Sequence, residues 1–216
     1  MDVGLQRKGG CKVMARYRGP RSRVCRRLDF PVFESDKFAN PRKKYIPGQH
    51  GPTSRVKLGN YGLQLREKQR MKYLYGVLEK QFRGYFRKAQ NKTGSTGHIL
   101  LQLLESRLDN TVYRLGLCPT RRSARQLVSH RHFLVNGNIV NIPSYQLKPG
   151  DTIQVRDKSK KVPIFQDSMR RIDGDNPTPW LSLDKAKLSG SFDESPKRED
   201  VLEPINEQLV VELYSK

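Results

Sequence analysis

The segment of residues 107–137, RLDNTVYRLGLCPTRRSARQLVSHRHFLVNG, constrains the fold more than any other part of the chain. At about 100° per residue, its apolar residues fall on one side of two short helices. The dipeptide Asn136-Gly137 then predicts a two-residue β-hairpin, because both positions tolerate a positive φ. Two amphipathic helices that lead into a hairpin indicate an α+β fold.

The polar sides of these two helices are strongly basic. In the helix that begins near Thr120, the side opposite the apolar residues carries Arg121, Arg122, Arg125 and Ser129. In the preceding helix, it carries Arg107, Asn110 and Arg114. Arginine binds phosphate through two parallel hydrogen bonds and stacks on bases, so we interpret these faces as an exposed cationic platform. The alternative is a solvated face on an ordinary helical hairpin.

Charge is distributed unevenly along the chain, whose formal net charge is +21. Residues 1–135 contain 30 lysines and arginines against 8 acidic residues, whereas residues 136–216 contain 12 against 13. A chain this basic would repel itself unless an acidic partner neutralised it. The first two thirds should therefore meet a polyanion, and the last third should pack within the molecule or meet protein.

The remaining elements follow from periodicity. Residues 1–60 are rich in Gly, Pro and basic residues, which favours an extended arm that orders on its partner. We predict two helices within 61–90, separated at Gly76, and a third after a Thr96 N-cap. Short strands are expected at 133–136, 138–141, 145–147 and 152–155, and a closing helix near 205–216, where VVELY also alternates like a strand.

The cysteines and the apolar segments indicate a cytoplasmic protein. Cys11, Cys25 and Cys118 are odd in number and lack the spacing of a metal site, so we expect free thiols in a reducing compartment. No apolar run approaches the roughly 20 residues that span a bilayer, and the N-terminus lacks the apolar centre of a signal peptide.

Three blocks carry a resemblance to a known RNA-binding module: RLDNTVYRLG, RRSARQLVSH and FLVNGNIVNIPSYQLKPGDTI. This module occurs in ribosomal S-four proteins, in some pseudouridine synthases and in certain tRNA synthetases. MARYRGPR, PGQHG, YGLQLREKQ, PWLSLD and NEQLVVELYSK, in this order, extend the resemblance to the whole S-four family of small-subunit ribosomal proteins. It covers residues 14–216, and bacterial members fit better than organellar ones.

The resemblance implies a structural, non-catalytic role. Members of the family bind small-subunit ribosomal RNA at a multi-helix junction of its five-prime domain early in assembly, and RNA shape would dominate that recognition. The family also implies a contact between the C-terminal part and ribosomal protein S-five that affects decoding accuracy. Basic residues after PGQHG line the tunnel through which messenger RNA enters, and Arg55 and Lys57 match them here, in a linker one residue longer than the family pattern.

The predicted RNA-binding residues lie in the arm, the first helices and the module. They are Arg16, Tyr17, Arg18, Arg21, Arg23, Arg26, Arg27, Lys43, Lys44, Gln49, His50, Arg66, Lys68, Arg70, Lys72, Arg107, Asn110, Arg114, Arg121, Arg122, Arg125, His130, His132 and Asn136. No cofactor or catalytic residue is predicted. Some relatives bind zinc through four cysteines, but only Cys25 stands at a matching place, with Ser22 and Phe38 at others.

The domain organisation that follows is a helical domain with an inserted module. Its parts are an unmatched extension (1–13), a basic arm (14–51), the first part of the helical domain (52–105), the module (106–170) and a C-terminal part that packs on the helical domain (171–216).

Two other classes of RNA-binding protein are alternatives to the ribosomal one. A pseudouridine synthase would need a catalytic domain after the module, and too few residues remain for one. A stand-alone RNA chaperone or messenger-binding regulator would need neither the arm nor the C-terminal segment.

Overall fold

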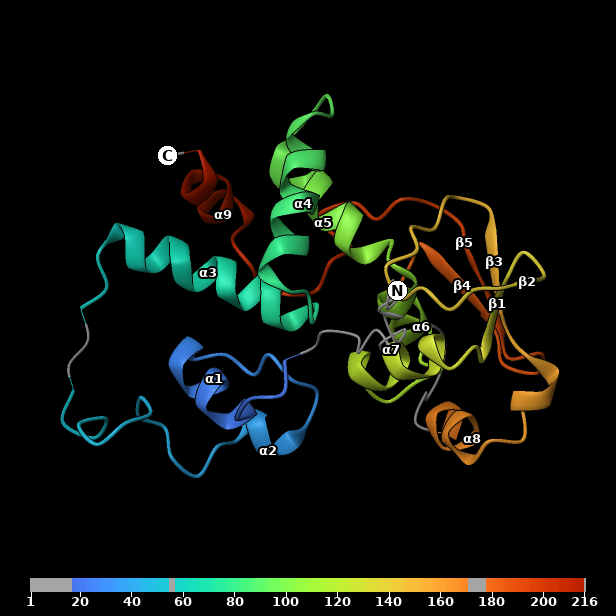
Figure 1. The fold of residues 1–216 in the computed structure, drawn as a ribbon, viewed down its shortest axis with the longest axis horizontal. Coiled ribbons are helices and arrows are strands. Elements are labelled where there is room, and N and C mark those ends of the chain that lie inside the picture. The colour runs from blue at the N-terminus through green and yellow to red at the C-terminus, as the bar shows by residue number, and fades with distance from the viewer. Residues whose placement is uncertain (1–16, 55–56, 171–177, 216) are drawn as a thin grey trace, which may run out of the picture.

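Four helices build the first core of the molecule (Figure 1). The computed structural model describes residues 17–54, 57–170 and 178–215. The helices are α3 (Asn60–Leu74), α4 (Glu79–Gln90), α5 (Thr96–Glu105) and α9 (Glu207–Tyr214). α4 packs along α5, and α9 returns from the far end of the chain onto α3 and α5. The predicted closing helix is thereby confirmed, and it completes an apolar core whose other members, apart from Ile205, lie more than 100 residues earlier in the chain.

The break between α3 and α4 lies where glycine predicted it. Gly76 has a φ of +60°, and the Val77 amide reaches back to the Lys72 carbonyl at 3.0 Å. In α4 the apolar residues Phe82, Tyr85, Phe86 and Ala89 are buried. The predicted Thr96 cap is wrong by one residue: Thr96 is the first helical residue, and Ser95 is the N-cap.

The second core forms where α6 (Leu108–Arg114) and α7 (Arg121–Ser129) cover an antiparallel sheet. The sheet order is β2-β1-β3-β5-β4. The predicted module contributes β1 (Phe133–Val135), β2 (Asn138–Ile139) and β3 (Asp151–Val155), and the C-terminal part contributes β4 (Leu181–Asp184) and β5 (Ser189–Phe192). A 3₁₀ turn η1 (Asp157–Ser159) and α8 (Pro163–Arg170) follow β3. The α+β class is confirmed.

The Asn136-Gly137 hairpin is also confirmed. Both residues have positive φ, 49° and 80°, as a tight hairpin turn requires. The Asn136 side chain braces the turn, because it donates to Asp151 Oδ1 at 2.8 Å and accepts from the Thr152 amide at 2.9 Å.

The predicted strand at 145–147 is wrong. This stretch crosses the junction of α5 and α6, where the Leu108 amide donates to the Tyr145 carbonyl at 2.9 Å and the Leu147 amide to the Ser106 carbonyl at 2.8 Å. Its backbone groups are thus satisfied by a helix junction and by one isolated bridge, between Arg107 and Gln146.

The C-terminal part, which we expect to pack on the helical domain, is divided between the two cores. β4 and β5 pair with each other, and β5 pairs with β3, so this hairpin extends the module's sheet. Trp180, Leu181 and Phe192 are buried in the core beneath α6 and α7. Only the last segment, with Ile205 and α9, joins the helical core.

The N-terminal arm is more ordered than its composition predicted. It contains α1 (Arg21–Leu28) and a single turn, α2 (Asp36–Ala39). Cys25, Leu28, Val32 and Phe33 form a small apolar cluster, and the arm therefore has a core of its own. The expectation of an extended segment is wrong for this stretch, because these four apolar residues pack together and hold α1 against the chain that follows it.

None of the helices in the described ranges is both long and apolar enough to cross a membrane.

Candidate nucleic-acid interface

The exposed cations of the arm gather on α1 and on a later loop of the arm. Arg21, Arg23 and Arg27 of α1 are exposed, and so are Lys43 and Lys44 in the loop after α2. Arg26 joins the two parts: its guanidinium lies 4.9 Å from the centre of the Tyr45 ring and donates to the Tyr45 and Ile46 carbonyls at 2.8 and 3.2 Å. The arrangement holds several positive charges close together on one surface.

The predicted binding residues of α3 have partners within the protein. Arg66 and Arg70 donate to the Leu28 carbonyl at 2.8 to 3.0 Å, so they fasten the C-terminal end of α1 to α3. Lys68 and Lys72 both bind the Glu79 carboxylate, at 2.8 and 3.1 Å. Burial acts to raise the pKa of Glu79, but these two lysines outweigh it and lower that pKa.

The cationic platform of the module is largely a buried ion-pair network, and its predicted exposure is wrong. Arg107 has no exposed surface; it donates twice to Asp109, at 3.0 and 2.7 Å, and once to the Tyr85 hydroxyl at 2.7 Å. Asn110 is 2% exposed and donates to the buried Glu105 carboxylate. These groups face inward because α6 packs against the end of α5, where Glu105 lies.

Arg114 and Arg121 share a second carboxylate from the C-terminal part. Arg114 binds Glu105 at 2.6 Å and Glu203 at 2.5 Å. Arg121 binds Glu203 at 2.7 Å and, from the arm, Glu34 at 3.0 Å. The network therefore ties the arm, the helical domain, the module and the C-terminal part together, and its acidic members come from distant positions in the sequence.

Burial and charge oppose each other at Glu203. Burial acts to raise the pKa of this carboxyl, and Arg114 and Arg121 outweigh it and lower that pKa. For Arg114, burial favours the neutral form, yet Glu105 and Glu203 raise its pKa. The buried charges are thus stabilised as ions by their partners, as buried charges must be.

The outer rim of α7 keeps some of the predicted platform. Arg122 and Arg125 are partly exposed, and His130 is exposed. Arg122 donates to the Tyr17 carbonyl at 3.5 Å, and Arg125 binds Asp109 at 3.1 Å. His132 Nδ1 lies 2.9 Å from the Ser159 hydroxyl, and burial, with help from His130 and Arg156, lowers its pKa.

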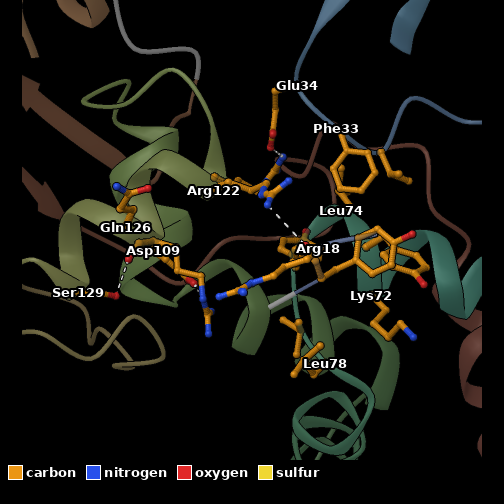
Figure 2. A pocket seen from close by; sticks show the side chains of 18 of the residues that line it. Arg18, Phe33, Glu34, Lys72, Leu74, Leu78, Asp109, Arg122, Gln126 and Ser129 are labelled. Atoms are coloured by element: carbon orange, nitrogen blue, oxygen red, sulfur yellow. Dashed lines mark hydrogen bonds and ion pairs between the residues drawn. The ribbon is translucent and has the colours of Figure 1, made fainter. Parts of the chain in front are cut away.

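A cleft of about 510 Å³ separates the arm from α7 (Figure 2). We call it the arm cleft. Figure 2 shows Asp109, Gln126 and Ser129 on one side of it and Phe33 and Leu74 on the other. It brings together the start of the arm, the turn between α3 and α4, and the outer face of α7.

The other predicted residues are scattered. Arg18, Gln49, His50 and Lys57 are exposed, and Asn136 is exposed at the hairpin tip. Arg16 and Arg55 lie outside the described residues. The sequence reasoning missed Glu34, Glu105 and Glu203, and no local pattern marks them; an arginine-rich face with too few acidic neighbours is the one available hint.

Cys25 and Cys118 are free thiols, as expected, and burial raises the pKa of each. Cys11 lies outside the described residues. In the part of the chain that the structure describes, no three His, Cys, Asp or Glu residues form a group that could hold a metal ion.

Comparison with known proteins finds a family for each of two adjoining segments of the chain. Residues 16–105 match the ribosomal protein S4/S9 N-terminal domain, and residues 106–153 match the S4 domain. The chain is 54% identical over 203 residues to small ribosomal subunit protein uS4 of Parabacteroides distasonis, and 53% identical to that of Porphyromonas gingivalis. It is 51% identical to that of Chlorobaculum tepidum. Each alignment covers 94% of this chain and the full length of the relative.

Proposed function

Because the chain belongs to the uS4 family of bacterial small ribosomal subunit proteins, we propose that it is a structural, non-enzymatic component of that subunit that binds ribosomal RNA. The module and the arm act as one binding unit. The observation that carries this proposal is the group of exposed arginines and lysines on α1 and on the loop after α2. They belong to the arm, whose residues 17–18 and 32–34 face the basic rim of α7 across the arm cleft.

We call the exposed side chains of Arg21, Arg23, Arg27, Lys43 and Lys44 the arm surface. This surface should contribute most of the affinity for RNA. Its arginines and lysines are exposed, so phosphate contacts there can release counterions from RNA. Arg122, Arg125 and His130, on and just after α7, provide a second group of side chains that can contact RNA. By contrast, Arg107, Asn110, Lys68 and Arg121 are buried in this conformation, and we assign them to holding the interface in shape.

The finer roles rest on the family. We propose that the RNA site is a multi-helix junction of the five-prime domain, bound early in assembly, with recognition dominated by RNA shape. The near-neutral C-terminal part is the proposed contact for ribosomal protein S-five, through which decoding accuracy would be affected. Arg55 and Lys57 are the proposed contacts to messenger RNA as it enters the subunit.

The proposal is tested by measuring affinity for the five-prime domain of small-subunit ribosomal RNA over a salt series, with a shuffled RNA of equal length beside it. We expect tight binding that prefers the folded junction and weakens steeply with salt. Equal affinity for both RNAs would leave only a general polyanion binder and would reject the ribosomal role.

The arm surface is tested by the double variant Arg23→Ala, Arg27→Ala. We expect weaker binding and a salt slope smaller by roughly two contacts, with the thermal unfolding midpoint unchanged. Lys185→Ala, Lys187→Ala removes the same charge from the exposed turn between β4 and β5 and should leave the affinity nearly unchanged. Equal losses in the two double variants would mean that net charge, and not this surface, sets the affinity.

A further inference from the structure

The arm cleft combines cationic side chains with an aromatic wall, and phosphate contacts alone would not need the aromatic wall. Five cationic side chains and two carboxylates line the cleft. Both carboxylates are already neutralised, Glu34 by Arg121 at 3.0 Å and Asp109 by Arg107 and Arg125 at 2.7 and 3.1 Å. Lys72 and Arg121 are paired with carboxylates of the protein as well. The positive charge that the cleft presents therefore comes mainly from Arg18 and Arg122.

Its inner wall is apolar and aromatic. Val32 and Phe33 of the arm and Leu74 at the end of α3 are buried there. The ring of Tyr17 lies nearly parallel to that of Phe33, at an interplanar angle of 13° with centroids 6.5 Å apart, and meets the Tyr73 ring edge to face at 5.1 Å. Flat rings of this kind are the surfaces on which proteins stack unpaired bases.

Arg125 has a hydrogen-bond donor without a partner in the described part of the chain. This residue lines the cleft, and its Nε is buried without an acceptor among the described residues, although its Nη1 binds Asp109. Buried donors are nearly always bonded, and this nitrogen belongs to a guanidinium that lines the cleft. Figure 2 shows Arg18 in the middle of the cleft, between the α7 side and the aromatic side.

From this combination we infer that the arm cleft receives one unpaired nucleotide of the bound RNA, its base against the aromatic wall and its phosphate among Arg18, Arg122 and Arg125. This inference deepens the proposed function and rests on it. A volume of about 510 Å³ is within the usual range for a small-ligand site. The cleft lies between the arm and α7, so a nucleotide held there would contact residues of both parts.

The test uses the full-length protein and two five-nucleotide single-stranded RNAs that differ only at the centre. One carries the fluorescent base 2-aminopurine there, and the other has no base. We expect the wild-type protein to bind the RNA with the base about tenfold more tightly, which corresponds to one stacked base, and to quench its fluorescence.

Gln126→Trp fills the rim of the cleft without changing its charge, since Gln126 is exposed on α7. It should remove the tenfold preference while binding of the RNA without the base stays unchanged. Gln81→Trp makes the same substitution at an exposed position on α4, away from the cleft, and should keep the preference. Circular dichroism establishes that both variants are folded.

Tyr17 separates stacking from simple apolar contact. Tyr17→Phe keeps the ring and should keep the quenching, whereas Tyr17→Leu keeps apolar bulk without a flat ring and should lose it. Equal wild-type affinity for the two RNAs would overturn the inference, and so would an undiminished preference in Gln126→Trp. Neither result bears on the comparison of folded and shuffled ribosomal RNA, so failure of this inference and failure of the proposed function can be told apart.

Discussion

Arg121 shows how a residue that looks like a ligand-binding group can be part of the protein interior. It is 8% exposed, and its guanidinium binds Glu34, Glu203 and the Asn110 side chain. It also lies over the rings of Tyr113 and Tyr75, at 4.5 and 5.5 Å from their centres. Every face of the group is occupied by the protein, so its charge stabilises the fold.

Replacing Arg121 should therefore destabilise the protein. Arg121→Ala removes the cation that binds the partly buried Glu34 and one of the two arginines that bind Glu203. We expect the free energy of unfolding to fall by about 3 kcal/mol. Arg23→Ala, at an exposed position on α1, should change it by less than about 0.5 kcal/mol. Urea denaturation of both variants measures this; similar small losses would mean that the network contributes little.

Glu203 should make stability depend on pH. Its pKa in the folded protein lies below the ordinary value of 4.5, so its contribution is present above about pH 4.5 and is lost as the pH falls through the lower, folded pKa. Glu203→Gln should lower the free energy of unfolding by about 2 kcal/mol at pH 7 and by less at acid pH. Denaturation at pH 3 to 7 checks this, and a loss that is the same across that range would contradict it.

At the scale of elements, the hairpin of β4 and β5 is fitted closely to α6. Gly190 on β5 leaves room for the neighbouring chain: a Cβ there would lie 2.6 Å from Leu115 Cδ2 and 2.7 Å from the Ser182 carbonyl oxygen. A side chain at this position would push β5 away either from α6 or from β4. The hairpin is thus an integral part of the module's core.

Gly190→Val should loosen this contact. Overpacking of a well-packed site costs roughly 1 to 3 kcal/mol, and we expect amide hydrogen exchange to rise in β4 and β5. Gly84→Val is a suitable control, since a Cβ at Gly84 meets nothing within 4 Å. Valine has a somewhat higher helix propensity than glycine, so exchange should rise neither in α4 nor in the sheet. Unchanged exchange in β5 after Gly190→Val would contradict the tight fit.

At the scale of the molecule, the four parts of the chain are joined by one charge-balanced network. Its cations, Arg107, Arg114, Arg121 and Arg125, all lie in the module. Of its anions, Glu34 lies in the arm, Glu105 at the end of α5 and Glu203 near the C-terminus, and only Asp109 lies in the module. The positive surface that remains for RNA is thereby held in one arrangement.

The predicted module should not fold without the β4–β5 hairpin. A fragment of residues 106–170 lacks Trp180, Leu181 and Phe192, which are buried in its core, and burial of each contributes about 2 kcal/mol. The total is comparable to the stability of a small domain. We expect cooperative thermal unfolding for a fragment of residues 106–193 and none for 106–170. A cooperative transition in the shorter fragment would show that the hairpin is dispensable.

Much of the fold was predictable because local rules decide it. The positions of α3, α4 and α9 follow from helical periodicity, the break between α3 and α4 from Gly76, and the β1–β2 turn from Asn136-Gly137. The β4–β5 hairpin was not predictable in the same way, because its strands are short and mixed in character and are stabilised mainly by pairing with β3, 35 to 41 residues earlier.

The sequence by itself determined the class of the fold, the charge asymmetry and the family, because composition, periodicity and contiguous motifs are properties of the chain. Only the tertiary structure decided which arginines face solvent. Helical periodicity separates apolar from polar sides, but it cannot tell a polar side that meets water from one that meets buried carboxylates. Arg23 and Arg121 look alike in the sequence, and they differ because Glu34 and Glu203 are brought to Arg121 by contacts across more than 80 residues.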